Sequence, residues 1–208
     1  MTTKGKFIVF EGTDGSGKTT QMKLLSEYLE SKGQKCYLTS EPTKSAFGML
    51  LRACLRGEVE TNEHTIAAMF AADRLDHVQS ADQGMLAQLE AGYTVLCDRY
   101  YFSSLAYNGG FVSFEWVEEL NRPAMELLKP DLIVYLDLDP EEAMQRVSRR
   151  SAQERYETLE RQKLIRGKYF EVFERYKERE NIAVIKSEKE KERTQAHIRA
   201  AADALFGF

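Results

Sequence analysis

An apolar run ends directly in a glycine-rich loop near the start of the chain, and this junction constrains the fold most. The run Phe7–Glu11 is followed by Gly12-x-x-x-x-Gly17-Lys18-Thr19, which is the spacing of a phosphate-binding loop. Glycines permit backbone angles that a side chain forbids, so the loop can turn its N–H groups toward phosphate oxygens. The sequence therefore predicts a strand, a phosphate-binding loop (the P-loop) and a helix that begins near Lys18.

The same loop carries the residues that a nucleoside triphosphate and its metal ion need. Lys18 can reach the β- and γ-phosphates, and the hydroxyl of Thr19 can bind Mg²⁺. The positive end of the following helix also favours an anion. We expect ATP to contact a continuous segment made of Gly12, Thr13, Asp14, Gly15, Ser16, Gly17, Lys18, Thr19 and Thr20.

Short apolar runs alternate with amphipathic stretches along the chain. The expected strands are Lys6–Glu11, Lys35–Ser40, Thr94–Asp98, Asp131–Asp137 and Ile182–Lys186. The expected helices are Lys18–Ser31, Ala46–Leu55, Glu63–Glu90, Phe114–Leu128, Pro140–Arg149, Leu159–Glu180 and Lys189–Leu205. Strands that are apolar on both faces are typical of a parallel sheet covered by helices. The alternation predicts the α/β fold class, as a five-stranded parallel sheet flanked by helices in the three-layer sandwich of P-loop NTPases.

Length and composition limit the class of function. A chain of 208 residues without a Pro/Gly/Ser-rich linker favours one domain over 1–208. The net charge of −4 argues against nucleic-acid binding. Cys36, Cys54 and Cys97 are isolated from one another, which fits reduced thiols better than disulfides. With no secretory leader and no apolar run near membrane-spanning length, we expect a cytoplasmic protein that does not bind membranes.

Polar residues follow the expected strands, where ligands bind in sheets of this kind. Asp98 and Arg99 end the third strand. An Asp there could hold a water of the Mg²⁺ shell, and an Arg could bind a phosphate through two hydrogen bonds. Asp137 ends the fourth strand and is a second candidate for the metal carboxylate, although we favour Asp98. Glu41 and Pro42 follow the second strand.

Two residues on one expected helix suggest the recognition of a planar base. Phe70 and Arg74 are four positions apart and therefore share one helix face. An aromatic ring can stack on a base, and a guanidinium can donate hydrogen bonds to a carbonyl. Taken alone, the pair is explained more simply as a core Phe and a solvated Arg.

An arginine-rich segment at about 146–158 is a candidate lid over the triphosphate. It contains Arg146, Arg149, Arg150 and Arg155. A mobile arginine can neutralise the charge that develops during phosphoryl transfer. A solvated helix end is the simpler alternative.

Motifs in a particular order resemble the thymidylate kinase family. They are Phe10-Glu-Gly-x-Asp-Gly-x-Gly-Lys-Thr-Thr-Gln21, Phe70-x-x-x-Arg74, Asp98-Arg-Tyr-x-x-Ser-x-x-Ala-Tyr107, Lys129-Pro-Asp-Leu132 and Glu154-Arg-Tyr-Glu157. The resemblance implies transfer of the ATP γ-phosphoryl group to dTMP with Mg²⁺, giving dTDP for dTTP biosynthesis, in a homodimer packed through helices. A kinase for another nucleotide or nucleoside, and a P-loop regulator without catalysis, remain as alternatives.

The resemblance also implies the residues that bind dTMP, which would be Asp14, Glu41, Phe70, Arg74, Arg99, Ser103, Tyr107 and Asn108. Phe70 would stack on thymine, Arg74 would bond a thymine carbonyl, and Ser103 and Asn108 would lie near the base. Arg99 would hold the acceptor phosphate. Asp14 would accept a hydrogen bond from the sugar 3′-hydroxyl, and Tyr107 would crowd the 2′ position.

The chain departs from the family pattern in two places. Ser40 stands where many members have the Arg of an Arg-Glu-Pro motif, and Lys44 is the nearest basic substitute. Gly15 stands where members with Asp at position 14 often have Arg. We therefore expect the lid to supply the catalytic arginine, as Arg149 or Arg150, beside Lys18, Asp98 and Arg99.

Overall fold

The computed structural model describes residues 4–81, 83–147 and 158–208, and it contains one five-stranded parallel sheet with the order β2-β3-β1-β4-β5. The strands are β1 (Phe7–Glu11), β2 (Lys35–Ser40), β3 (Tyr93–Asp98), β4 (Leu132–Asp137) and β5 (Ile182–Lys186). Each strand boundary lies within one residue of the expected position. The predicted five-stranded parallel α/β sheet is therefore confirmed, with β1 at its centre.

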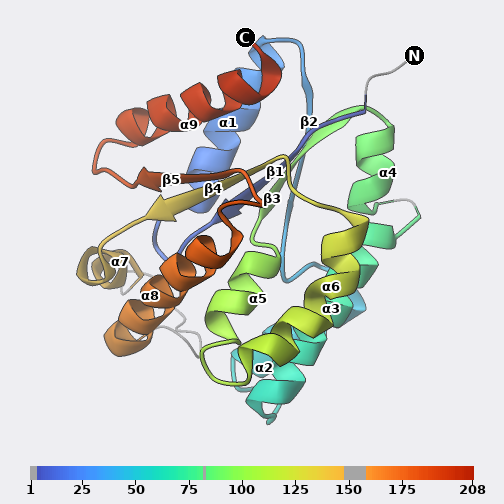
Figure 1. Ribbon diagram of the computed structural model, residues 1–208, viewed down its shortest axis with the longest axis vertical. Coiled ribbons are helices and arrows are strands. Elements are labelled where there is room, and N and C mark those ends of the chain that lie inside the picture. The colour runs from blue at the N-terminus through green and yellow to red at the C-terminus, as the bar shows by residue number, and fades with distance from the viewer. Residues whose placement is uncertain (1–3, 82, 148–157) are drawn as a thin grey trace.

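Helices cover both faces of the sheet (Figure 1). On one face lie α1 (Lys18–Ser31) and α9 (Lys191–Phe206). The other face carries α3 (Glu63–Gln79), α5 (Tyr101–Tyr107), α6 (Phe114–Leu127) and α8 (Leu159–Tyr176). The remaining helices in the described part of the chain are α2 (Ala46–Leu55), α4 (Met85–Glu90) and α7 (Pro140–Val147).

The central strand shows why its sequence is apolar at every position. Phe7 and Val9 pack into the cluster beneath α3, α5, α6 and α8, whereas Ile8 and Phe10 pack into the cluster beneath α1 and α9. Successive side chains of a strand point to opposite faces, so both faces of β1 are core. The strand is thereby fixed in position, and the P-loop that follows it begins at a defined point.

Two helical expectations were wrong. The expected helix Glu63–Glu90 is two helices, because α3 ends at Gln79 and α4 begins only at Met85. Gly84 N donates to Ser80 O at 2.8 Å, and a Cβ on Gly84 would lie 2.3 Å from that oxygen. The short helix α5 was not expected, because all of its residues are buried and it therefore has no polar face to mark a helical period.

The strand registers bring the candidate ligands to one edge of the sheet. Phe10 of β1 and Ser40 of β2 both pair with Asp98 of β3. The P-loop, Glu41 and Arg99 therefore leave their strands side by side. This is the carboxyl edge, where ligands of open α/β sheets bind.

A buried hydroxyl in the core gives a test of this packing. Tyr135 on β4 is fully buried, and its hydroxyl has no hydrogen-bond partner among the described residues. We expect Tyr135→Phe to leave the free energy of unfolding unchanged or raise it by about 1 kcal/mol, since an unsatisfied buried hydroxyl is removed.

The matched control is Tyr100→Phe, because the Tyr100 hydroxyl donates to Ala124 O at 3.2 Å and Leu128 O at 3.1 Å. This change should lower the free energy of unfolding by about 1 kcal/mol, measured by urea denaturation. Equal losses in the two variants would contradict the described surroundings of Tyr135.

Candidate active site

The P-loop closes around its own lysine. The backbone φ values of Gly12, Gly15 and Gly17 are 144°, 84° and 95°. Residues that carry a side chain rarely adopt such values. A Cβ on Gly12 would also lie 2.8 Å from Leu136 O. The buried Lys18 Nζ donates to Gly12 O at 3.1 Å and to Thr13 O at 3.3 Å. The loop is thus shaped as the spacing predicts, with its ammonium group held inside it.

A hydroxyl and a carboxylate lie together at the start of α1. Thr19 Oγ1 donates to Asp98 Oδ2 at 3.0 Å, and Lys18 Nζ lies 3.9 Å from Asp98 Oδ1. Asp137 is instead held by Arg166, through bonds of 2.6 and 2.8 Å. Of the two carboxylates considered from the sequence, Asp98 is therefore the one beside the P-loop hydroxyl.

Arg99 joins the P-loop to α5. It is a non-glycine residue with a φ of 72°, a left-handed conformation that is uncommon for such residues. Its Nη2 donates to Asp14 Oδ1 at 2.6 Å and to the Tyr107 hydroxyl at 3.0 Å, and its Nη1 donates to Ser103 Oγ at 3.1 Å. The guanidinium also lies 4.7 Å from the centre of the Tyr107 ring. The fold thus brings together residues that the sequence suggested separately.

Burial acts to lower the pKa of both cations of the site, but their neighbours oppose this effect to different extents. Burial lowers the pKa of Lys18, and the neighbouring Arg99 lowers it further, although Asp98 opposes this effect. Burial also acts to lower the pKa of Arg99, but Tyr107 and Asp14 hold it well above the usual value. Arg99 therefore stays charged and is available to bind an anion.

Two neighbouring cavities meet at Asp14 and Arg99. A P-loop cavity of about 290 Å³ is lined by Asp14, Gly15, Gly17, Lys18, Thr19, Thr20, Ser40, Glu41, Pro42, Arg52, Asp98 and Arg99. A narrower pocket of about 60 Å³ is lined by Asp14, Pro42, Leu55, Phe70, Arg99, Ser103, Ser104, Tyr107 and Asn108. Asp14, Pro42 and Arg99 line both, so groups bound in the two cavities would face each other there.

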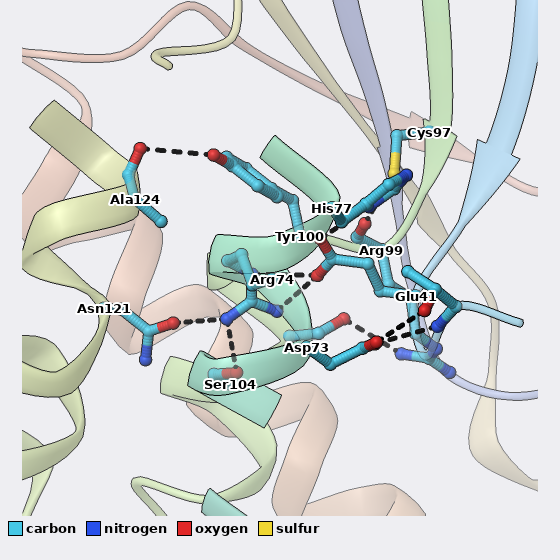
Figure 2. A network of polar contacts seen from close by, with 12 residues as sticks. Glu41, Asp73, Arg74, His77, Cys97, Arg99, Tyr100, Ser104, Asn121 and Ala124 are labelled. Atoms are coloured by element: carbon cyan, nitrogen blue, oxygen red, sulfur yellow. Dashed lines mark hydrogen bonds and ion pairs between the residues drawn. The ribbon is translucent and has the colours of Figure 1, made fainter. Parts of the chain in front are cut away.

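Arg74 lies buried behind the narrow pocket, whereas Phe70 lines it. Figure 2 shows the Arg74 guanidinium between Glu41, Ser104 and Asn121. Its Nε donates to Glu41 Oε2 at 2.8 Å, and its Nη1 donates to Ser104 Oγ at 2.9 Å and to Asn121 Oδ1. Arg74 has no exposed surface, so the simpler explanation of a solvated arginine is wrong. It adjoins the pocket through Ser104.

Glu41 and Asn108 occupy contrasting positions around this pocket. The Glu41 carboxylate bonds Arg74 and also lies 3.1 Å from His77 Nδ1 (Figure 2). Asn108 is 1% exposed, and both ends of its amide lack a hydrogen-bond partner among the described residues. Unpaired buried amides are rare. The Asn108 side chain thus offers a donor and an acceptor next to the narrow pocket that it lines.

The basic residues expected near the phosphates fall into three groups. Arg146 Nη1 donates to Gly15 O at 3.4 Å, while Arg149, Arg150 and Arg155, and most of the lid segment, lie outside the described residues. Lys44 lines a different cavity beside β2.

Arg52 was missed in the sequence, because it lies inside an amphipathic helix without a motif to mark it. The structure places it on α2 at the wall of the P-loop cavity. Its Nε donates to Thr43 O at 3.4 Å, and its Nη2 donates to Pro42 O. Arg52 therefore adds a second guanidinium to the wall of the cavity that Arg99 also lines.

Comparison with known proteins adds the decisive observation, since the family model described as thymidylate kinase matches residues 10–198. The chain belongs to the thymidylate kinase family. It is 37% identical to a probable thymidylate kinase of Thermococcus kodakarensis, over 97% of this chain and 98% of the relative. It is 46% identical to a thymidylate kinase of Pelotomaculum thermopropionicum, over 70% and 68% of the two chains.

Family membership makes this chain a phosphotransferase that converts dTMP to dTDP with ATP as the donor. The resemblance drawn from the motifs is thereby confirmed. Within the described residues, no helix is both long enough and apolar enough to cross a membrane.

The contact between Asp14 and Arg99 gives a test of sugar recognition. An ionised Asp14 can only accept hydrogen bonds, so it matches the 3′-hydroxyl of dTMP. We expect the wild-type kcat/KM for dTMP to exceed that for 3′-deoxy-dTMP by about tenfold or more. Asp14→Ala should abolish this preference, measured by ADP release with both substrates.

The control for this test is Asp203→Ala, because Asp203 is a carboxylate on α9 that accepts from the Tyr28 hydroxyl at 2.7 Å. It should keep the preference of the wild-type protein. A preference that survives Asp14→Ala would assign sugar recognition to other residues.

Proposed function

We propose that phosphoryl transfer from ATP to dTMP takes place where the two cavities meet, with the triphosphate in the P-loop cavity and the thymidine part of dTMP in the narrow pocket. The observation that carries this proposal is that Asp14 and Arg99 line both cavities. Phosphoryl transfer needs two anions held in line with their charge neutralised, and little covalent chemistry from the protein. A donor and an acceptor bound on either side of Arg99 would meet this requirement.

Two guanidinium groups would hold the acceptor phosphate. Arg99 now pairs with Asp14 at 2.6 Å, and Arg52 lines the same cavity. A phosphate is the better partner for a guanidinium fork because it offers more oxygens and more charge. Its arrival would free the Asp14 carboxylate for the 3′-hydroxyl. This exchange links phosphate binding with sugar recognition.

The narrow pocket suits a pyrimidine with both donor and acceptor groups. Phe70 provides an aromatic surface, and the Asn108 amide has no other partner among the described residues. Thymine presents an N–H between two carbonyls, which matches an amide that both donates and accepts. Behind the pocket, the Arg74 guanidinium donates to the hydroxyl of Ser104, which leaves the Ser104 proton available to a group in the pocket. Tyr107 would close the pocket against a 2′-hydroxyl.

Mg²⁺ fits the oxygen ligands at the start of α1. Thr19 Oγ1 and Asp98 Oδ2 lie 3.0 Å apart, and Mg²⁺ prefers such hard oxygen ligands while keeping several waters. The ion would neutralise charge on the β- and γ-phosphates. Lys18 would release its bonds to the loop carbonyls and contact the transferring group.

Additional positive charge at the transferring group would come from the segment after α7. Arg146 already donates to the backbone oxygen of Gly15, a residue that has no side chain of its own to supply a charge. Arg149 and Arg150 follow it in the sequence and remain our candidates for the catalytic arginine. The P-loop residues Thr13, Ser16 and Thr20 would complete the contacts with ATP.

We also propose that two copies of the chain associate through the helices on the α3 and α6 side, in the cytoplasm. Phe47, Met49 and Leu50 on α2 and Trp116 on α6 are large apolar residues that are 52%, 63%, 52% and 37% exposed. Helices α2 and α6 both pack against α3, and large exposed apolar residues on them favour an interface. Cys36, Cys54 and Cys97 are free thiols, which suits a reducing compartment.

A substitution on α2 tests the proposed dimer. Met49→Glu places a charge where the partner would bury a methionine, so we expect the sedimentation coefficient to fall from that of a dimer to that of a monomer. Lys23→Glu, on the exposed surface of α1, should leave it unchanged. A wild-type protein that sediments as a monomer would contradict the proposal.

The activity itself is tested by ADP release with dTMP, dUMP, dCMP and thymidine as acceptors. We expect the highest kcat/KM with dTMP and no turnover of thymidine, which has no phosphate for Arg99 to hold. Lys18→Ala should lower kcat by about 10²-fold or more, because a charged contact with the transferring group is lost.

The matched control for Lys18→Ala is Lys23→Ala, a lysine on the exposed side of the same helix. Turnover of thymidine equal to that of dTMP would indicate a nucleoside kinase. Tight ATP binding without turnover of any acceptor would indicate a P-loop regulator.

A further inference from the structure

Glu11 is a buried carboxylate with no role in the site described so far. It is the last residue of β1, directly before the P-loop, and it has no exposed surface. Burial raises its pKa, while hydrogen bonds from Ser103 and Tyr169 and the charge of Arg99 oppose the rise. A buried ionisable group is costly unless its hydrogen bonds are fully made. Its contacts therefore show what it holds in place.

One carboxylate oxygen of Glu11 holds the backbone of the turn that carries Arg99. Glu11 Oε1 accepts from Tyr100 N at 2.9 Å and from Ser103 N at 3.2 Å. These N–H groups belong to the start of α5, where Tyr100 provides no side-chain cap. Arg99 immediately precedes them and has the left-handed φ of 72°. The contacts of Oε1 therefore fix the backbone from which the Arg99 side chain leaves.

The other carboxylate oxygen orients two hydroxyls toward the guanidinium. Glu11 Oε2 accepts from Ser103 Oγ at 2.6 Å and from the Tyr169 hydroxyl at 2.8 Å. The same hydroxyl oxygens lie 3.1 and 3.5 Å from Arg99 Nη1, which donates to them. A hydroxyl that donates its proton to a carboxylate has lone pairs left to accept from a guanidinium. By accepting the protons of both hydroxyls, Glu11 thus turns their lone pairs toward Arg99.

We propose that Glu11 is a positioning residue that acts through Ser103 and Tyr169 to set the Arg99 guanidinium for the acceptor phosphate. This inference rests on the proposed role of Arg99. The carboxylate matters because all four groups that face it are donors. In Glu11→Gln, the NH₂ group of the amide would face groups that are themselves donors. This would disrupt either the contact with the turn at Tyr100 or the orientation of the two hydroxyls.

The test compares dTMP with thymidine, because thymidine lacks the phosphate that Arg99 would hold. The KM for dTMP and the inhibition constant of thymidine against dTMP turnover are measured for Glu11→Gln and Tyr169→Phe. Tyr169→Phe removes one relay hydroxyl and keeps the ring, so it tests the proposal even if Glu11→Gln does not fold. We expect both substitutions to raise the KM for dTMP about tenfold and to raise the inhibition constant of thymidine by less than about twofold.

The matched control is Tyr101→Phe. Tyr101 is also fully buried, lies on α5 and bonds a carboxylate, Glu180 Oε1, at 3.1 Å. Loss of the Tyr101 hydroxyl should change neither the KM for dTMP nor the inhibition constant of thymidine by more than about twofold, although it also removes a hydrogen bond from a tyrosine to a carboxylate. If Tyr169→Phe weakened dTMP and thymidine equally, or weakened neither, Glu11 would be a structural residue alone and the proposal would be overturned.

A double-mutant cycle separates this inference from the proposed role of Arg99. Arg99→Ala should weaken dTMP far more than thymidine, and Tyr169→Phe should then have no further effect on dTMP. If Arg99→Ala weakened both ligands equally, the proposed role of Arg99 would fail. If Arg99→Ala had the expected effect but Tyr169→Phe still weakened dTMP in that background, only the relay from Glu11 would fail.

Discussion

The contact between Asp14 and Arg99 is the interaction on which the rest of the site depends. It joins the P-loop after β1 to the turn after β3, with Nη2 and Oδ1 2.6 Å apart. The parallel register of the central strands brings the two loops together, and buried packing on both faces of β1 fixes that register. A phosphate donor and a phosphate acceptor can therefore be held on either side of one guanidinium.

Two buried carboxylates hold the arginines that lie in and behind the narrow pocket. Glu11 holds the turn and the hydroxyls around Arg99, and Glu41 pairs with Arg74. An exposed arginine samples many rotamers, and ordering such a side chain on binding costs free energy. Both arginines are already held by hydrogen bonds within the protein, which would reduce this cost for the ligand that we propose. Preorganised charge is also what phosphoryl transfer requires of a protein.

The sequence predicted what local patterns encode. Apolar runs located each strand of the sheet to within one residue, and glycine spacing located the P-loop. It missed α5, whose residues are all buried, and it merged α3 with α4 because their apolar positions continue across the turn at Gly84. The burial of Arg74 depends on partners far away in the sequence, such as Asn121, and no local pattern marks such a contact.

The most direct test is a crystal structure with dTMP and a non-hydrolysable ATP analogue bound together. Our account predicts that the dTMP phosphate replaces Asp14 as the partner of Arg99, that Asp14 accepts from the 3′-hydroxyl, and that the γ-phosphate faces the dTMP phosphate across the shared wall of the two cavities. A complex in which the 2.6 Å pair between Asp14 and Arg99 persists, with the dTMP phosphate bound elsewhere, would contradict it.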